Sequence, residues 1–242
     1  QGMSAIDRRI NRLAADGTRR LLVATARGLY QLGGRGRSMW TRHDGLPSSD
    51  IHAVKLISGG IAVGTAEGAA LITSNKSGSS RIKPLGRKQG LPVRAIWDLA
   101  QAADGALWLA SSWGAYRYDD GDVQRFSVAT SHLQDDWVTA LATCGDTVFV
   151  GTYKGGVTRL SRHVDRWRGT PLAGLHVNLG GLAVSSGQLL AATMEGLFHT
   201  DLGLPGGKLA RVGPAGNATA VLAQGAHVLT GSRDGAVSRP LR

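Results

Sequence analysis

Cysteine, glutamate and long hydrophobic runs are scarce in this chain of 242 residues. A single cysteine, Cys144, rules out an intramolecular disulfide and fits a reducing compartment. Because Cys144 follows the apolar run 138–142, we expect a buried structural thiol. No run approaches the roughly 20 apolar residues that a membrane-spanning helix needs. We therefore expect a soluble protein without membrane insertion.

The N-terminal residues contain no apolar segment of the kind found in secretory leaders. Residues 1–2, Gln-Gly, resemble the remnant of a cleaved expression tag, so we expect the native chain to begin at Met3. These features favour a cytoplasmic protein, with a periplasmic or secreted location if a leader has been trimmed away.

Sequence motifs for catalysis and for metal or phosphate binding are missing. There is no Gly-x-Ser-x-Gly nucleophile elbow and no phosphate loop, and the seven histidines are spread singly. The cluster of Asp119, Asp120 and Asp122 lacks the ligand spacing of a calcium loop and is interpreted as a turn. We predict no catalytic residues, no cofactor and no metal site.

A short motif occurs six times: an apolar strand runs into Thr or Ser, followed by two variable residues and Gly. The copies lie at 24–28, 64–68, 110–114, 151–155, 192–196 and 231–235. Their successive glycines are 39 to 46 residues apart, a period typical of β-propeller blades.

Each repeat has the pattern of a four-stranded antiparallel meander, with short apolar runs separated by turn signals. A single meander cannot cover both faces of its own sheet, so six meanders are expected to stack radially. We predict an all-β, six-bladed β-propeller that forms a single domain over residues 3–242. Its last blade is expected to be either incomplete or closed by an N-terminal strand from residues 3–6.

Residue size along the repeats predicts where the blades pack. Small residues stand near the ends of the second strands, where the blades converge and large side chains would collide. Trp40, Phe126 and Trp167 each lie twelve residues after the Gly of their repeat, which predicts aromatic packing between neighbouring blades. Trp97 and Trp108 lie in apolar runs and are interpreted as core residues.

The phrases at 44–51, 90–96 and 103–111 resemble the two-component regulator propeller repeat, whose pattern runs Gly-Leu-Pro, apolar strand, Asp-Gly and Leu-Trp-Ile-Gly-Thr. The resemblance implies a bacterial ligand-sensing propeller. In that family such propellers lie outside the membrane and are joined to a transmembrane helix and a histidine kinase, neither of which is found in this sequence. Propeller lyases that inactivate streptogramins are similar only in the spacing of their blade repeats along the chain.

The variable turn residues and the loops between blades are expected to share one face of the propeller, here called the turn face, which is the usual binding surface of this architecture. The turns contribute Arg27, Glu67, Trp113, Tyr153, Lys154, Met194, Glu195, Arg233 and Asp234, and the inter-blade loops contribute Arg94, Asp135, Asp136, Trp137, His176 and Asn178. Trp113 and Tyr153, at neighbouring turns, are expected to be exposed, and exposed aromatics beside charges favour a protein or sugar contact.

The net charge of +11 favours acidic partners. Many basic residues fall in the third-to-fourth strand loops and the outer strands: Arg35, Arg37, Arg42, Lys76, Arg81, Lys83, Arg87, Lys88, Arg159, Arg162, Arg166 and Arg168. They predict a basic rim that would bind an acidic protein.

Three hypotheses follow from the sequence. The first is a non-enzymatic interaction or ligand-sensing module that binds another protein. The second is a lyase or hydrolase with a small ligand in the central channel, using His176 or channel acids with a divalent metal. The third is nucleic-acid binding by the basic rim, which no recognised motif supports.

Overall fold

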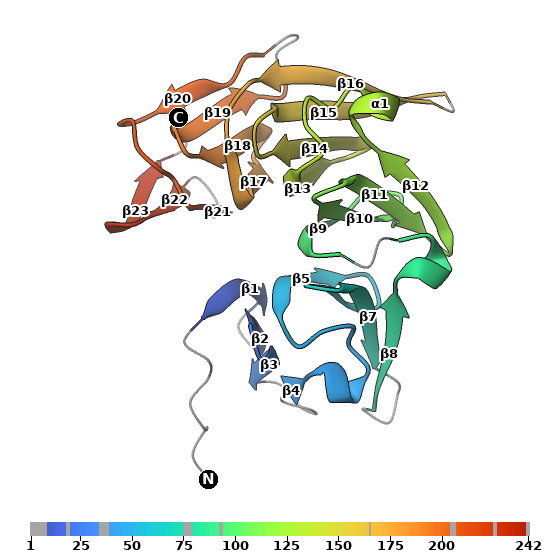
Figure 1. Ribbon diagram of the computed structural model, residues 1–242. Helices are drawn as coiled ribbons and strands as arrows, with labels where there is room; N and C mark the ends of the chain where they lie inside the picture. Colours follow the sequence, from blue (N-terminus) through green and yellow to red (C-terminus); the bar gives the residue numbers. More distant parts are fainter. Residues whose placement is uncertain are drawn as a thin grey trace. The chain divides into compact units, whose positions relative to one another are not determined.

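The protein is described by a computed structural model, shown in Figure 1. The structure describes residues 9–17, 20–33, 39–74, 79–91, 94–164, 166–203, 207–224 and 227–240. The expected tag remnant, the expected N-terminal closing strand at 3–6, and Arg35, Arg37 and Lys76 of the basic rim lie outside these residues.

Antiparallel sheets follow one another along the chain, and the first three have four strands each. The first contains β1 (Ile10–Asp16), β2 (Arg20–Thr25), β3 (Gly28–Gly33) and β4 (Met39–Trp40). The second contains β5 (Ile51–Ile57), β6 (Gly60–Thr65), β7 (Gly68–Ser74) and β8 (Ser80–Leu85). The third contains β9 (Ile96–Gln101), β10 (Leu107–Ser111), β11 (Gly114–Asp119) and β12 (Asp122–Phe126).

The next two sheets have four strands and the sixth has three in the described part of the chain. The fourth contains β13 (Val138–Cys144), β14 (Thr147–Thr152), β15 (Gly156–His163) and β16 (Arg166–Ala173). The fifth contains β17 (Val177–Ser185), β18 (Gln188–Thr193), β19 (Gly196–Asp201) and β20 (Ala210–Val212). The sixth contains β21 (Ala220–Gln224), β22 (His227–Ser232) and β23 (Gly235–Pro240).

Each sheet is a meander in which strands pair in chain order, so the prediction of a six-bladed β-propeller is confirmed. The described N-terminal strand, β1, pairs with β2 as the first strand of the first blade. Short helices follow three of the blades: η1 (Arg42–Asp44), η2 (Arg87–Gln89) and α1 (Val128–Ser131). None of the helices in the described ranges is long and apolar enough to cross a membrane.

The chain divides into two compact units. The first consists of Gln1–Leu99 with Gly121–Val123, and the second of Ala100–Asp120 with Gln124–Arg242. The first unit therefore holds the first two blades, and the second holds the last three together with most of the third. That the chain is a single domain stays a prediction.

The repeated Thr or Ser closes the turn between the second and third strands. In the second blade, the Thr65 hydroxyl donates to the Gly68 carbonyl at 2.9 Å and accepts from the Glu67 amide at 3.1 Å. The corresponding hydroxyls of the other five blades make the same bond to the glycine that begins their third strand. In the fourth blade that glycine is Gly156, because the turn is one residue longer. The motif therefore specifies turn geometry as well as packing.

Side chains near the start of the first strands connect neighbouring blades within each unit. In the first unit, the Asn11 amide donates to the Ile51 carbonyl of the next blade at 2.7 Å. In the second unit, the Thr139 hydroxyl donates to the Val177 carbonyl at 2.8 Å, and the Asn178 amide donates to the Ala218 carbonyl at 2.7 Å. Each bond gives a buried or half-buried backbone carbonyl of the next blade a side-chain donor.

The predicted aromatic packing between blades is present. In the second unit, the ring of Trp108 lies 4.7 Å from that of Phe126 and 5.1 Å from that of Trp167, which comes from the next blade. In the first unit, Trp40 is buried against Ile51 and Ile72 of the second blade. These contacts bury the apolar faces that a solitary meander would expose to water.

Two details of the turns bear on the sequence expectations. The expectation that Cys144 is buried is wrong: it is exposed, because it ends β13 and pairs with Thr147 across a tight turn. Asp119, Asp120 and Asp122 surround the turn between β11 and β12, where Asp120 has a φ of 41° and Gly121 a φ of 109°. No group of side chains in the described ranges has the arrangement of a metal site.

Candidate functional site

The turn-face residues of the second unit include a row of contacting rings. The ring of Trp137, in the loop before β13, lies 4.7 Å from the ring of Tyr153, in the turn between β14 and β15. Tyr153 in turn meets His176, in the loop before β17, edge to face at 6.0 Å. We call Trp137, Tyr153 and His176 the aromatic ridge. It runs from the fourth blade to the fifth.

Much of the aromatic ridge is open to solvent. Trp137 is 41% exposed, and the neighbouring Met194 is 42% exposed. Tyr153 and His176 are half-buried. Exposed aromatic and thioether side chains that lie near one another favour a contact surface.

The Asp135 carboxylate joins the loop that carries Trp137 to the turn that carries Tyr153. One carboxylate oxygen of Asp135 accepts the backbone amide of Trp137 at 3.1 Å, and the other accepts that of Lys154 at 3.0 Å. The Tyr153 amide also donates to the Trp137 carbonyl at 2.9 Å. The loop and the turn are therefore joined before any partner binds, which reduces the entropy lost on binding.

His176 is paired with Glu195 of the same blade. The imidazole Nδ1 is hydrogen-bonded to Glu195 Oε1, and the backbone amide of His176 donates to Oε2 at 3.2 Å. Burial raises the pKa of Glu195, but hydrogen bonds from the His176 side chain and from backbone amides outweigh it and lower the pKa below its ordinary 4.5. Glu195 is therefore ionised at neutral pH and orients the imidazole.

Replacing Glu195 with glutamine is expected to lower stability by about 0.5 kcal/mol at neutral pH, because the pair is partly exposed. Since folding lowers the pKa of Glu195, its contribution is fully present above pH 4.5 and is lost as the pH falls through the lower folded-state value. Thermal melts of both proteins should therefore differ from neutral pH to about pH 5 and converge toward pH 3. A difference that persists unchanged at pH 3 would contradict the pairing.

Two other turn-face residues, Trp113 and Asp136, lie beside the ridge. Trp113, which is 48% exposed, occupies the turn between β10 and β11. The amide of the following residue, Gly114, donates to the Asp136 carbonyl at 2.7 Å, and Arg125 donates to the Trp113 carbonyl at 2.7 Å. The Asp136 carboxylate accepts the Val128 amide at 2.7 Å.

The remaining turn-face residues of the second unit have different surroundings. The amide of Asn178 is bonded to Asn217 and to the Ala218 carbonyl, so it connects the fifth and sixth blades. Arg233 and Asp234 form the exposed turn between β22 and β23, where the Asp234 amide donates to Ser232 Oγ at 3.2 Å.

In the first unit, the predicted site residues come from separate turns and loops. Arg27 lies between β2 and β3, Glu67 between β6 and β7, and Arg94 in the loop before β9. Glu67 forms an ion pair with Arg42 at 3.3 Å. These three residues do not form a row like the aromatic ridge in the contacts that the structure describes.

Sequence reasoning missed a polar network in the first unit. The His52 ring stacks flat on Trp97 with centroids 4.6 Å apart, so Trp97 is not a plain core residue. His52 Nε2 lies 3.4 Å from the Asp50 carboxylate, whose other oxygen is 3.5 Å from Arg9. Asp50 and His52 flank a buried strand residue, a pattern too short to predict this contact from the sequence.

The described part of the basic rim includes an arginine-rich hairpin in the second unit. Arg162, Arg166 and Arg168 are exposed on β15 and β16, and Arg159 is half-buried on β15. Clustered arginines of this kind attract acidic surfaces and phosphate backbones. Binding of an acidic protein or of nucleic acid by the rim stays a prediction.

No family model matches the sequence, and no curated protein matches it either. Solved structures do match its fold. The extracellular domain of BT3049 from B. thetaiotaomicron, assigned to a hybrid two-component system, matches at TM-score 0.75 and 17% identity, covering 98% of this chain and 34% of that one. The extracellular domain of BT4673 from the same organism, assigned to a one-component or hybrid two-component system, matches at TM-score 0.73 and 18% identity, covering 96% and 33%.

The chain shares the propeller fold of these extracellular domains. The fold implied by the resemblance in the repeat phrases is therefore confirmed. The chain spans about one third of the length of these extracellular domains. The fold also resembles that of an enzyme, virginiamycin B lyase from Staphylococcus aureus, at TM-score 0.66 and 11% identity, covering 95% of this chain and 83% of that one.

The expectation of a cytoplasmic location is wrong. The domains of BT4673 and BT3049 that share this fold are extracellular, which points to a periplasmic or extracellular location. The expectation rested on a single cysteine and on the residues at the N-terminus. A propeller held together by apolar packing and hydrogen bonds needs no disulfide, so a low cysteine count does not distinguish the compartments.

Proposed function

We propose that this propeller is a non-enzymatic sensing module that binds a partner protein through the aromatic ridge. The single observation that carries the proposal is the contact of Trp137, Tyr153 and His176 across two blades, with Trp137 41% exposed. Aromatic side chains that lie together on a rigid scaffold are typical of the residues that dominate binding energy in protein interfaces.

The hydrogen bonds around the ridge support the same proposal. Asp135 and Glu195 use both carboxylate oxygens to hold the loops that carry Trp137, Tyr153 and His176. These carboxylates therefore position the rings, and the apolar ring surfaces are left to make the contact. The fold shared with extracellular sensor domains is consistent with a module whose task is recognition.

The test is a double replacement of Trp137 and Tyr153 with alanine. Each replacement is expected to weaken partner binding by about 1 to 4 kcal/mol, the range of interface anchors, while the fold stays intact because both side chains lie on loops at the surface. The immobilised wild-type and double-variant proteins would be compared for capture of proteins from a periplasmic extract. The affinity of each captured protein would then be measured after purification.

The matched control is Leu222→Ala, which removes a side chain that is 60% exposed on β21, away from the ridge. The proposal expects a partner that the wild type and the Leu222 variant bind equally and that the double variant binds at least tenfold more weakly. A partner that binds all three proteins with equal affinity would contradict the role of the ridge.

A second candidate function is a lyase or hydrolase, and the His176–Glu195 pair favours it. A carboxylate that orients an imidazole is the arrangement that general acid–base catalysis uses, and His176 is 44% exposed. The fold is also shared with a propeller lyase. An enzyme of this kind would lose turnover on replacing His176 with alanine, whereas a binding module has no turnover to lose.

A further inference from the structure

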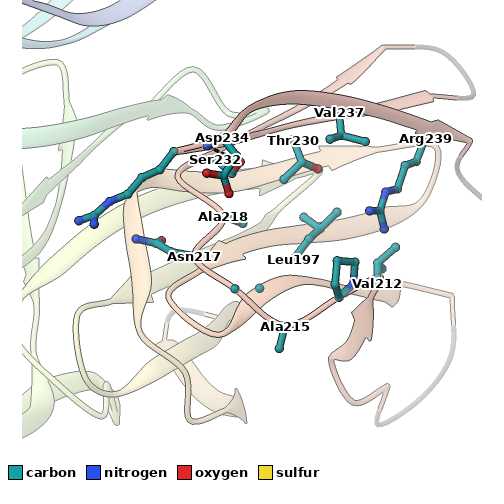
Figure 2. A pocket seen from close by; sticks show the side chains of 14 residues that line it. Leu197, Val212, Ala215, Asn217, Ala218, Thr230, Ser232, Asp234, Val237 and Arg239 are labelled. Carbon is teal, nitrogen blue, oxygen red and sulfur yellow. Dashed lines mark hydrogen bonds between the residues drawn. The ribbon is translucent and has the colours of Figure 1, made fainter.

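A hollow of about 330 Å³ lies between the fifth and sixth blades, within the second unit. Figure 2 shows its lining, with Thr230 on β22 and Arg239 on β23 on one side and Leu197 and Val212 on the other. The volume is within the range of small-molecule sites. It is separate from the aromatic ridge, since none of the three ridge residues lines it.

The strand registers show which residues between the first and second blades correspond to the residues that line the hollow between the fifth and sixth blades. Leu197 pairs with Val212 as Leu29 pairs with Trp40. Thr230 pairs with Val237 as Val63 pairs with Ala70, and Val228 pairs with Arg239 as Ile61 pairs with Ile72. Ala218 precedes Ala220 as Ile51 precedes Ala53, and those two alanines face Gly231 and Gly64.

Between the first two blades these positions form a closed core. Leu29, Trp40, Ile51, Val63, Ala70 and Ile72 are all at most 3% exposed and belong to one apolar cluster. The same positions between the last two blades hold Leu197, Val212, Ala218, Thr230, Val237 and Arg239, which line the hollow. Valine in place of tryptophan and alanine in place of isoleucine leave the space unfilled.

The two polar replacements give the hollow its chemistry. Thr230 Oγ1 is buried and has no hydrogen-bond partner among the described residues. Arg239 extends from β23 toward Val212, and its guanidinium packs over Gly213. In the described chain, no carboxylate lies within ion-pair distance of Arg239. Asp234 lines the opposite end of the hollow beside Arg233.

Both groups would cost free energy in a closed core, because an unpaired hydroxyl and a guanidinium lose their hydration there. A ligand that supplies an acceptor to each would remove that cost. The space beside them has the position, relative to its two blades, that the indole ring of Trp40 fills between the first and second blades. Flat apolar bulk and a negative charge beside Arg239 are thus the two features that this hollow lacks.

We propose that the hollow is a binding site for a small aromatic carboxylic acid. The aromatic ring takes the space between Leu197, Val212 and Val237, and the carboxylate accepts hydrogen bonds from the Arg239 guanidinium. The Thr230 hydroxyl donates to a second polar atom of the ligand. Such a site would let the sensing module respond to a small molecule independently of a protein on the ridge.

Indole-3-acetate is a suitable probe, and indole-3-acetamide is its neutral control. Indole-3-acetate is expected to bind the wild type with a Kd of about 1 mM, because a ligand of this size makes few contacts. Indole-3-acetamide is expected to bind about tenfold more weakly. Both would be measured by NMR titration of the full chain. Arg239→Gln is expected to bring the acetate down to the affinity of the acetamide.

Val212→Trp, which restores the residue found at the Trp40 position, is expected to fill the hollow and abolish binding of both probes. Arg168→Gln removes an exposed arginine of β16 as a matched control and should leave both affinities unchanged. The Trp137 and Tyr153 double variant should also bind the acetate normally, which separates this site from the ridge. Folding of every variant is checked by circular dichroism.

Three results would overturn the proposal: no saturable binding of the acetate to the wild type, equal affinities for acetate and acetamide, or unchanged acetate binding by Arg239→Gln. Arg239→Gln is a fair test of the site, because Arg239 is only half-buried and its substitution does not require the core to repack. An acidic peptide that binds at the hollow while the free acid does not would also overturn it in favour of a protein ligand.

Discussion

Replacing Trp108 with alanine is expected to lower the free energy of unfolding by about 3 to 5 kcal/mol, the range for a buried tryptophan. Trp108 is 0% exposed on β10, and its ring contacts Phe126 of its own blade and Trp167 of the next. The replacement leaves a cavity between two blades whose sheets cannot readily approach each other. Urea unfolding, followed by circular dichroism, would measure the loss.

Trp113→Ala is the matched control for this prediction, because it removes the same ring from a residue that is 48% exposed. It is expected to change stability by less than about 0.5 kcal/mol. If both variants lost the same stability, the Trp108 cluster would not be the main packing contact between these blades. A further variant, Trp108→Phe, keeps most of the ring and should lose less than Trp108→Ala.

The blade architecture was predictable because the repeated Thr or Ser has one structural task. Its hydroxyl closes the turn that joins the second and third strands, so the residue recurs wherever that turn recurs. The aromatic packing was predictable for a related reason. Trp40 and Phe126 stand at a constant distance from the turn glycine, which places them between neighbouring blades.

The number of strands in the last blade was less predictable. The sequence allows an incomplete sixth blade or an N-terminal closing strand, and the described residues show a three-stranded sheet that ends at β23. Strand pairing between segments far apart in the chain leaves little trace in local patterning. Cys144 shows the same limit on a smaller scale, since one position along a strand decides whether a side chain faces the core or the solvent.

The candidate site was predictable as a set of residues but not as a set of contacts. The repeat pattern places Trp137, Tyr153, His176 and Glu195 in loops and turns of one face. Which of them touch depends on the lengths and bulges of β13 and β17, which shift the register by one or more residues. Trp113 and Tyr153 stand out in the sequence, whereas the ring contact in the structure joins Tyr153 to Trp137.

The hollow between the last two blades illustrates a third kind of limit. Each of its lining residues is unremarkable in the sequence, because Val212, Thr230 and Arg239 all occur commonly in strands. Only the register shows that they occupy the positions of Trp40, Val63 and Ile72. Repeat proteins offer this comparison within one chain, so a departure from the repeat can be recognised as a candidate site without any relative.

The second prediction with a large effect concerns Gly156, which begins β15. Replacing it with alanine is expected to cost about 4 kcal/mol, near the upper end for a single substitution. Its φ is 74°, and an added Cβ would lie 1.6 Å from the carbonyl oxygen of Ala173. Because that oxygen belongs to the backbone of the paired strand β16, the clash is relieved only by separating the two strands.

Gly145→Ala separates the clash from the backbone conformation. Gly145 has a φ of 54°, but an added Cβ would meet nothing within 4 Å. This variant should therefore cost only the strain of a left-handed alanine, about 1 kcal/mol. The expected difference of about 3 kcal/mol between the two variants is then the cost of moving β16 away from β15. If the two variants lost the same free energy of unfolding in urea, β15 and β16 would separate at little cost. The fourth strand of this blade would then contribute little to its stability.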